Sequence, residues 1–351
     1  MEFYKTKAQR SGVQTILQTI KECRLISKRE LQEVTGLSWG HISQVTNRFL
    51  EEGYIVVAEN EMTAGRSREL LDINRNDNYF IGVDLNSQRV RAVVTDMKGR
   101  VICETRKEWD EAERETVLKN LFGVIDDFID RFKDKRMIGI GFSVQGIVDI
   151  VNGISVSISS IKNWTDVPLK ELAEERYGMD VAIAHDPDCV MKYECSCGVL
   201  KNSEAQNILT IIYTYGLGIG MSIMMNGQIY LGAQGRVGEL DHTILNVNED
   251  GWHNMLGQHI DKRDTDIDMK VLGDYIGRSI AMANSFLNPE IIVMHIVESD
   301  YREQIFETVQ YNLKNYSYNR NVPLRLSALN KNEKAVGAAL ILVDREIDRI
   351  V

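Results

Sequence analysis

The residues best suited to chemistry in this chain lie close together between Ser38 and Arg48. Their side chains carry hydroxyl, amide, imidazole, indole and guanidinium groups, which form hydrogen bonds with base edges and phosphates in a DNA major groove. The candidate contacts are Ser38, Trp39, His41, Ser43, Gln44, Asn47 and Arg48. The alternative is a small helical bundle with a polar outer face.

Helical spacing explains how one segment presents these side chains together. Ile42, Val45 and Phe49 recur at intervals of three and four residues, so they are predicted to face inward and leave the polar groups outside. Ser38 is expected to cap the helix, because its hydroxyl accepts a hydrogen bond from a free backbone N–H.

Two further helices are predicted before this one. Leu31 and Val34 are expected on the apolar face of a short helix that Gly36 ends, since glycine tolerates positive φ. An amphipathic helix over residues 11–23 precedes it, with an apolar stripe of Val13, Ile16, Leu17 and Ile20. The three helices predict a helix-turn-helix.

Two strands, over residues 54–57 and 69–73, follow the helices. The turn between them carries Arg66, Ser67 and Arg68, and arginine suits the negative potential of a narrow minor groove. The pattern predicts a winged helix that binds DNA with helix and wing. A solvated hairpin is the alternative.

The charge of the chain is uneven. Its 351 residues have a net charge of −10, but the first 50 residues carry eight Lys or Arg against four Glu, so the remainder carries −14. A basic end on an acidic body is expected if only that end meets phosphate. No apolar run approaches the roughly 20 residues that span a bilayer, and five cysteines are too few and odd in number for a disulfide framework, so a cytoplasmic protein is expected.

The rest of the chain contains one pattern twice. Three strands, a helix and a strand are predicted at 79–84, 90–95, 101–106, 116–132 and 138–142. The same order returns at 208–215, 218–225, 228–231, 271–287 and 291–295. The duplication predicts two similar α/β lobes, with ligands at the carboxyl ends of the strands.

Several segments, in this order, resemble the ROK family of repressors and sugar kinases. They are the wing turn 64–67, the strand and loop 139–149, the segments 163–164 and 167–169, the stretch 184–188, the loops 216–220 and 238–242, and the helix segment 335–339. The resemblance implies a two-lobed actin-like, ribonuclease H-like ATPase fold after the winged helix. It also places Asp186 where the kinases of the family have their catalytic base.

Departures from the family pattern argue against phosphoryl transfer. The first phosphate loop of the kinases is Asp-x-Gly-Gly-Thr, whereas residues 84–88 read Asp-Leu-Asn-Ser-Gln, without the glycines that admit phosphate. Gln145 replaces a usual proline, and Leu217 stands where a threonine would meet phosphate. The resemblance therefore favours a regulator without catalytic residues or a cofactor, in which Asp186 is a vestige.

A metal site is not expected either. The zinc cysteines of the family are missing after His242. A tetrahedral site from His185, Cys189, Cys195 and Cys197 is conceivable, but buried structural cysteines are the preferred interpretation.

By resemblance, the sugar-binding positions are Asn163, His185, Asp186, Glu239 and His242. Their amide, carboxylate and imidazole groups offer donors and acceptors to sugar hydroxyls. The alternative is that they are remnants that bond one another.

Together these observations predict an α/β protein with a winged helix-turn-helix at 1–75, a first lobe at 76–190 and a second lobe at 191–351. Packing of the last helix against the first lobe is an alternative. The expected function is a transcriptional regulator, a repressor of carbohydrate-related genes, that binds a palindromic operator as a homodimer or tetramer and responds to a sugar or sugar phosphate. The alternatives are a divergent sugar kinase and a ligand-independent DNA-binding dimer.

Overall fold

The computed structural model describes residues 12–23, 25–63, 66–109, 112–158, 160–214, 218–233, 235–240, 244–247, 253–255, 269–297, 300–328 and 331–349. The chain forms two compact units. Unit 1 comprises residues 1–196 together with 332–351, and unit 2 comprises residues 197–331. The division between the lobes therefore falls six residues after the one drawn from the sequence at 190, and the last helix belongs to unit 1.

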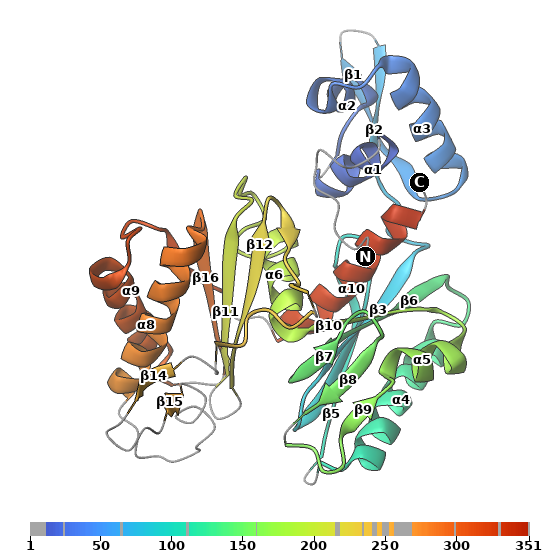
Figure 1. The fold of residues 1–351 in the computed structure, drawn as a ribbon. Coiled ribbons are helices and arrows are strands. Elements are labelled where there is room, and N and C mark those ends of the chain that lie inside the picture. The colour runs from blue at the N-terminus through green and yellow to red at the C-terminus, as the bar shows by residue number, and fades with distance from the viewer. Residues whose placement is uncertain are drawn as a thin grey trace. The chain divides into compact units, whose positions relative to one another are not determined.

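Unit 1 begins with a winged helix-turn-helix, here called the head (Figure 1). Its elements are α1 (Gly12–Glu22), α2 (Lys28–Thr35), α3 (Trp39–Glu51), β1 (Ile55–Thr63) and β2 (Arg66–Ile73). The caps are those that the sequence predicts: Gly36 adopts a left-handed φ of 70° after α2, and the Ser38 hydroxyl accepts from the His41 N–H at the start of α3. The strands are longer than predicted, because cross-strand pairing extends from Ile55–Ile73 to Thr63–Arg66.

The three helices of the head bury one apolar core. Its fully buried members include Ile16, Leu17, Ile20, Leu31, Ile42 and Phe49, with Val45 at 5% exposure. The inward prediction for Val34 is wrong, since its side chain is 63% exposed. Helix α2 has only eight residues, so a single buried residue, Leu31, anchors it and its last turn faces solvent.

The lobe of unit 1 is built on a five-stranded sheet with the order β10-β6-β3-β4-β5. Its strands are β3 (Tyr79–Leu85), β4 (Arg89–Thr95), β5 (Val101–Glu108), β6 (Met137–Val144) and β10 (Asp180–His185). β10, β6 and β3 run parallel, so their carboxyl ends share one edge, where ligands usually bind in such sheets.

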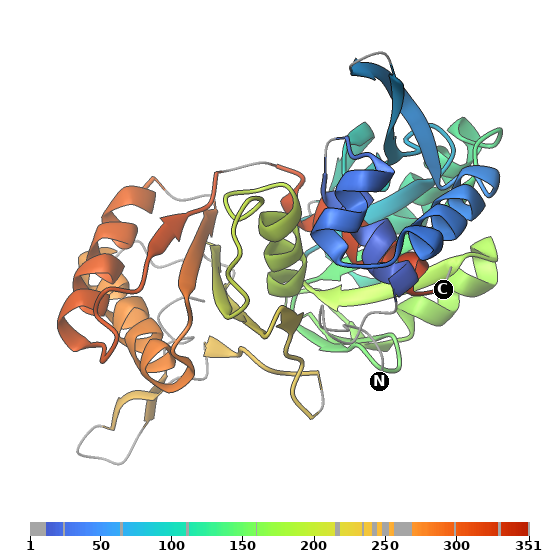
Figure 2. The same ribbon diagram turned by 90° about the horizontal axis from the view of Figure 1, so that it is seen from above.

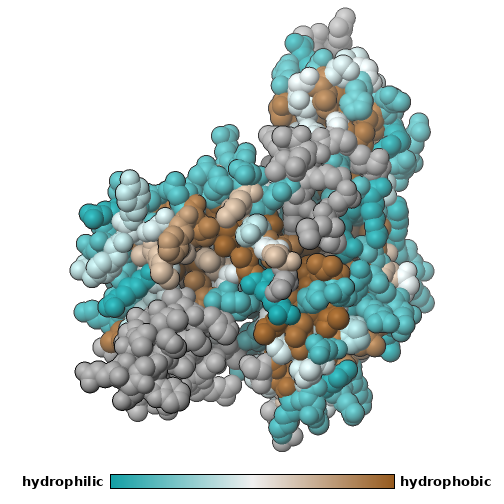
Figure 3. Space-filling model, viewed as in Figure 1, coloured by the Kyte–Doolittle hydropathy of each residue, from teal (hydrophilic) through white to brown (hydrophobic). Residues whose placement is uncertain are grey.

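Smaller elements complete the lobe. They are α4 (Arg114–Arg131), β7 (Ile147–Asp149), β8 (Ile154–Ser157), β9 (Thr165–Val167), α5 (Leu169–Tyr177), α6 (Asp186–Ser196) and α10 (Glu333–Arg349). Helix α4 buries one stripe that includes Leu121, Ile125 and Phe128, and the surface over α4 and α5 is largely hydrophilic (Figure 3).

Helix α10 lies against both the sheet and α6. A Cβ atom on Gly82 of β3 would approach the Ala335 carbonyl oxygen to 1.9 Å, and one on Gly141 of β6 would approach the Ala338 oxygen to 2.2 Å. Glycines in the strands therefore let the helix backbone come close. The other side of α10 contributes to one hydrophobic cluster with the core of the head.

Polar contacts also join the head to α10. Lys21 of α1 lies 2.8 Å from Asp344, and Gln14 donates to Asp348 at 2.7 Å. Lys192 of α6 pairs with Asp344 as well. Burial alone would raise the pKa of Asp344, but the two ammonium groups outweigh burial and hold the pKa well below the usual carboxyl value.

Unit 2 has its own five-stranded sheet, ordered β13-β12-β11-β16-β17. The strands are β11 (Ile208–Thr214), β12 (Gly218–Met225), β13 (Gln228–Ile229), β16 (Ile291–Val297) and β17 (Leu324–Leu326). Helices α8 (Met269–Leu287) and α9 (Arg302–Tyr316) cover one face of this sheet (Figure 2), and a separate pair is formed by β14 (Ile244–Val247) and β15 (His253–Met255). The duplicated strand–helix–strand order predicted from the sequence is present in both units. Among the described helices, none is long and apolar enough to cross a bilayer.

Candidate functional site

The exposed face of α3 carries part of the predicted DNA contacts. Gln44 and Asn47 are exposed, and Trp39 is 51% exposed at the first position of the helix. Ser38 is also exposed, although its hydroxyl already caps the helix. Lys28 of α2 donates to Asn47 Oδ1 at 2.8 Å.

The remaining α3 candidates are less open than the sequence suggests. His41, Ser43 and Arg48 are half-buried. The His41 ring lies over the start of α1, because a Cβ atom on Gly12 would be 2.6 Å from its Nε2. Arg48 lies 5.0 Å from the Phe49 ring centroid and 3.7 Å from Glu52. These three side chains border the exposed face of α3.

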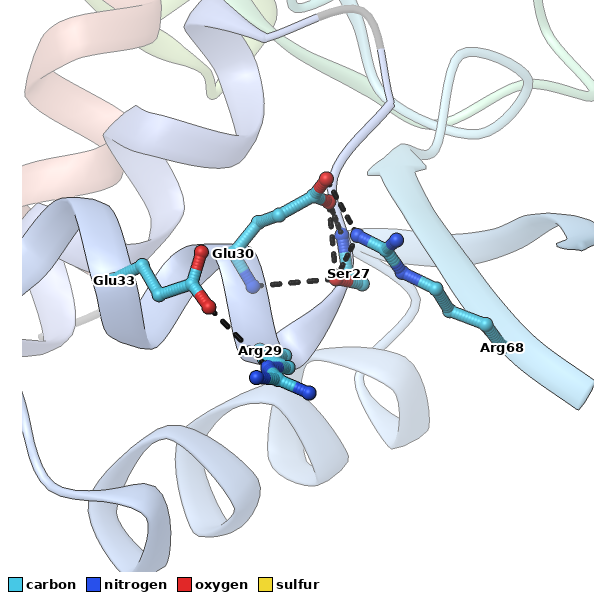
Figure 4. Close-up of polar contacts among 5 residues, drawn as sticks. All are labelled: Ser27, Arg29, Glu30, Glu33 and Arg68. Carbon is cyan, nitrogen blue, oxygen red and sulfur yellow. Dashed lines mark hydrogen bonds and ion pairs between the residues drawn. The ribbon is translucent and has the colours of Figure 1, made fainter. Parts of the chain in front are cut away.

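Of the two arginines predicted at the wing, the structure describes the side chain of Arg68 but not that of Arg66. The backbone of Arg66 and Ser67 opens β2, while their side chains lie outside the described part. Arg68 reaches the amino end of α2, where its Nη2 lies 2.5 Å from Glu30 Oε1 and donates to the Ser27 hydroxyl at 2.8 Å (Figure 4). The guanidinium that the sequence assigned to the minor groove therefore contacts the protein.

A buried charge centre lies at the carboxyl ends of β3 and β10. Asp84 is 6% exposed, and Asp186 is 9% exposed at the start of α6. The Lys334 ammonium of α10 donates to Asp186 Oδ2 at 2.6 Å, and the His185 Nε2 lies 3.6 Å from Asp186 Oδ1. His185 and Asp186 stay predictions as ligand positions, and the sequence did not indicate Lys334 as their neighbour.

The two carboxylates differ in proton affinity. Burial raises the pKa of Asp84, against the field of Lys334. Burial acts on Asp186 in the same direction, but Lys334 outweighs it, so the pKa of Asp186 is below its usual value. A carboxylate held this way is a weak base.

The loop after β3 is filled by side chains. Asn86 Oδ1 accepts from the N–H groups of Gln88 and Arg89 at 2.9 and 3.0 Å. Gln145 Oε1 accepts from the Ser87 N–H at 3.4 Å, and the Trp109 indole donates to the Ser87 carbonyl at 2.7 Å. The backbone donors that a phosphate loop directs at its ligand are here used within the protein.

The other predicted ligand positions belong to different parts of the chain. Asn163 has a left-handed φ of 60°, and its side chain donates to Glu113 at 3.4 Å. Glu239 is half-buried in unit 2, and His242 lies outside the described residues. These positions therefore stay predictions.

The cysteines of the conceivable zinc set are free of disulfides. Burial raises the pKa of Cys195 to about 11 and that of Cys189 well above its usual value, so both stay protonated. Within the described residues, no group of three or more His, Cys, Asp or Glu side chains is arranged to hold a metal ion.

Comparison with protein-family models gives two matches. The ROK family model matches residues 80–260. A model described as winged helix-turn-helix DNA-binding matches residues 14–56.

Two relatives carry repressor names. The putative xylose repressor of Caldicellulosiruptor sp. (strain Rt8B.4) is 29% identical over 245 residues, which cover 67% of this chain and 59% of that protein. The match thus spans about three fifths of that relative. The xylose repressor of Bacillus subtilis (strain 168) is 24% identical over 388 residues, 99% of this chain and 98% of that protein.

The fold has a solved counterpart. A crystal structure described as a ROK family transcriptional regulator, a homologue of the E. coli MLC protein, matches with a TM-score of 0.79 and 18% identity, over 96% of this chain and 97% of that chain. At this identity the likeness concerns the fold.

Proposed function

Because the chain belongs to the ROK family and begins with a winged helix-turn-helix of the DNA-binding kind, we propose that it is a repressor of carbohydrate-related genes in the cytoplasm. The observation that carries the proposal is α3, a capped helix that stands on a fully buried core and exposes Gln44 and Asn47. Amide side chains on such a helix can read base edges in a major groove.

In this proposal a homodimer, or a tetramer built from it, places two α3 helices in major grooves about 34 Å apart on a palindromic operator. The bases are contacted by Trp39, His41, Gln44 and Asn47. Phosphates or bases are contacted by Ser38, Ser43 and Arg48. Arg66 and Ser67 at the wing tip enter the minor groove.

The proposed effector is a sugar or a sugar phosphate. The names of the two matched relatives support a carbohydrate link. Residues His185 and Asp186 lie at the strand edge where ligands usually bind, and Asn163, Glu239 and His242 are the further candidates.

We further propose that the chain lacks kinase activity. Phosphoryl transfer needs a phosphate cradle, a metal ion and a positioned base. Two features speak against it: Asn86 and Gln145 occupy the N–H groups of the loop after β3, and Lys334 pairs with Asp186.

Binding to DNA from upstream of its own gene tests the main proposal. Fluorescence anisotropy should show affinity that falls steeply between about 50 and about 200 mM salt. Gln44→Ala and Asn47→Ala should each cost about 1–3 kcal/mol and relax the preference for operator over random DNA. Gln304→Ala, an exposed glutamine on α9, is the matched control. Binding without salt dependence, or equal effects of all three variants, would contradict the proposal.

Thermal-shift measurements separate the alternatives. A sugar or sugar phosphate that raises the melting temperature supports the ligand-responsive repressor, because a ligand that binds only the folded state stabilises it. A rise with Mg²⁺ and ATP would favour the divergent kinase. DNA binding without any response to a sugar panel would favour the ligand-independent dimer.

A further inference from the structure

Arg68 joins the wing to the amino end of α2. It lies in β2 opposite Glu61 of β1, and its side chain extends to Ser27 and Glu30. Figure 4 shows the guanidinium beside these two residues, with the separate Arg29–Glu33 pair on the same helix. The side chains of Arg68 and Glu30 are partly exposed, at 33% and 43% of their surfaces.

Ser27 and Glu30 are the two residues that cap α2. The Glu30 N–H donates to the Ser27 hydroxyl at 3.2 Å, and the Ser27 N–H donates to Glu30 Oε2 at 2.9 Å. This is a capping box, which satisfies backbone donors at both positions. The Ser27 backbone donor and Arg68 together lower the pKa of Glu30. Arg68 therefore adds a third member, from another element, to the cap of α2.

Residues on either side of the cap of α2 contact both β2 and α3. Ile26, just before the cap, exchanges two backbone hydrogen bonds with Leu71 of β2, at 2.9 and 3.1 Å. Lys28, just after the cap, donates to Asn47 on α3. Because the cap of α2 contacts both β2 and α3, a movement of β2 relative to the cap also moves β2 relative to the exposed face of α3.

We propose that Arg68 is a positioning residue that fixes the wing against the cap of α2 and so sets the distance between the wing tip and α3. It acts through Glu30 and does not touch DNA. The inference rests on the proposed DNA binding. It replaces the minor-groove role that the sequence suggests for this residue.

The two roles predict opposite effects of Glu30→Gln. If Arg68 binds DNA, removing its acidic partner frees the guanidinium and removes a charge that repels phosphate, so binding strengthens. If Arg68 positions the wing, the same change loosens the wing and binding weakens. Glu33→Gln removes an equal charge from the same helix without touching the wing, and is the matched control.

Operator binding is measured across a salt series for the wild type, Arg68→Ala, Arg68→Lys, Glu30→Gln, the Arg68→Ala and Glu30→Gln double variant, and Glu33→Gln. We expect Arg68→Ala and Glu30→Gln each to weaken binding about three- to tenfold relative to Glu33→Gln, with no further loss in the double variant. Arg68→Lys should restore part of the affinity, since it keeps one charged donor. The slope of log affinity against log salt should stay unchanged in Arg68→Ala.

Two results would overturn the inference: tighter binding by Glu30→Gln than by Glu33→Gln, or a salt slope reduced by about 0.9 in Arg68→Ala, the value for one lost phosphate contact. Hydrogen exchange of the free protein gives a second, DNA-independent readout. Amides of β1 and β2 should exchange faster in Arg68→Ala and Glu30→Gln than in Glu33→Gln, and equal rates would also overturn it. If the wild type binds no DNA, the proposed function is wrong. Hydrogen exchange still tests whether Arg68 fixes the wing in that case.

Discussion

The ammonium group of Lys334 lies 2.6 Å from Asp186 and also acts on the buried Asp84. Buried carboxylates need a cation, and here α10 supplies one that is covalently part of the chain. This single residue changes what the site can do, because a carboxylate paired with an ammonium takes up a proton less readily.

Replacing Lys334 with Met should destabilise unit 1 by about 3–5 kcal/mol, since it leaves Asp186 buried without its cation. The sign of the pH dependence should also reverse. In the wild type the pKa of Asp186 is lowered, so its contribution to stability is present above the usual carboxyl pKa and is lost as pH falls. In Lys334→Met the largest opposing influence on burial is gone and only His185 and a backbone hydrogen bond still lower that pKa, so the pKa should rise and acidification should recover stability.

Urea midpoints at about pH 5 and about pH 7.5 test this, because the variant's ionised Asp186 should cost most at the higher pH. Lys119→Met, at an exposed lysine of α4, is the control. Adding Asp186→Asn to Lys334→Met should recover part of the loss. A variant as stable as Lys119→Met at the higher pH would show that the pair contributes nothing.

At the scale of elements, the contact between α6 and α10 depends on a glycine. A Cβ atom on Gly337 would approach the Cys189 carbonyl oxygen to 1.9 Å, which no rotation of a side chain can relieve. Gly123 of α4 is the matched position, because a Cβ atom there would meet no atom within 4 Å.

Gly337→Ala should therefore destabilise the protein by about 1–3 kcal/mol or more, through overpacking of two helices. Gly123→Ala should stabilise it by about 0.5–1 kcal/mol, because alanine is the better helix former. Thermal melting of both variants beside the wild type measures this. Equal melting temperatures for the two variants would contradict the close approach.

Elements specified by nearby residues were predictable from the sequence. The stripe in α1, the inward residues of α3, the end of α2 at Gly36 and the cap at Ser38 all depend on spacings of a few residues. The Val34 prediction failed because α2 is too short for its last turn to reach the core. Element boundaries moved where pairing with a distant strand decides them, as in β1 and β2.

The candidate sites divide in the same way. The polar face of α3 and the loss of glycines after Asp84 could be recognised in the sequence. The partners of Arg68 and Asp186 could not, because Glu30 and Lys334 lie 38 and 148 residues away, respectively, and no periodic pattern links them. The available signal for Lys334 was a lysine directly before the apolar run of residues 335–343 in the same helix.

At the scale of the whole molecule, unit 1 combines the head and a sheet through α10. The first turn of α10 pairs with Asp186, and its later turns pair with Lys21 and Tyr54 of the head. One helix thus connects the charge centre with the DNA-binding elements. Its cation partners Lys21 and Lys192 both contact Asp344, and the three side chains are 5%, 14% and 17% exposed, respectively.

Asp344→Asn should destabilise unit 1 by about 3–5 kcal/mol and speed hydrogen exchange in α1 but not in α4, because two buried ammonium groups lose their carboxylate. The pKa of Asp344 is lowered, so in the wild type this contribution is complete above about pH 5 and falls only in stronger acid. The Asp344 carboxylate should hence add no pH dependence to the protection of α1 between about pH 5 and about pH 8. Glu346→Gln removes a negative charge from the same helix but keeps an oxygen that can accept from the Tyr54 hydroxyl, which lies 3.3 Å from Glu346 Oε1, so it should have a smaller effect. Equal protection of α1 in both variants would show that Asp344 does not fasten the head.

The chain leaves unit 1 after Ser196 and returns to it at Asn332, so all of unit 2 is translated in between. During synthesis on the ribosome, β3 and β6 are made long before α10, the helix that covers them. Unit 2 is contiguous in the sequence, so it can fold before α10 has been synthesised. During that interval the nascent chain exposes the apolar face of the sheet, and the head lacks α10 to pack against. We therefore expect the nascent chain to bind chaperones. A chain truncated before α10 would keep this apolar surface exposed, and we expect it to be degraded.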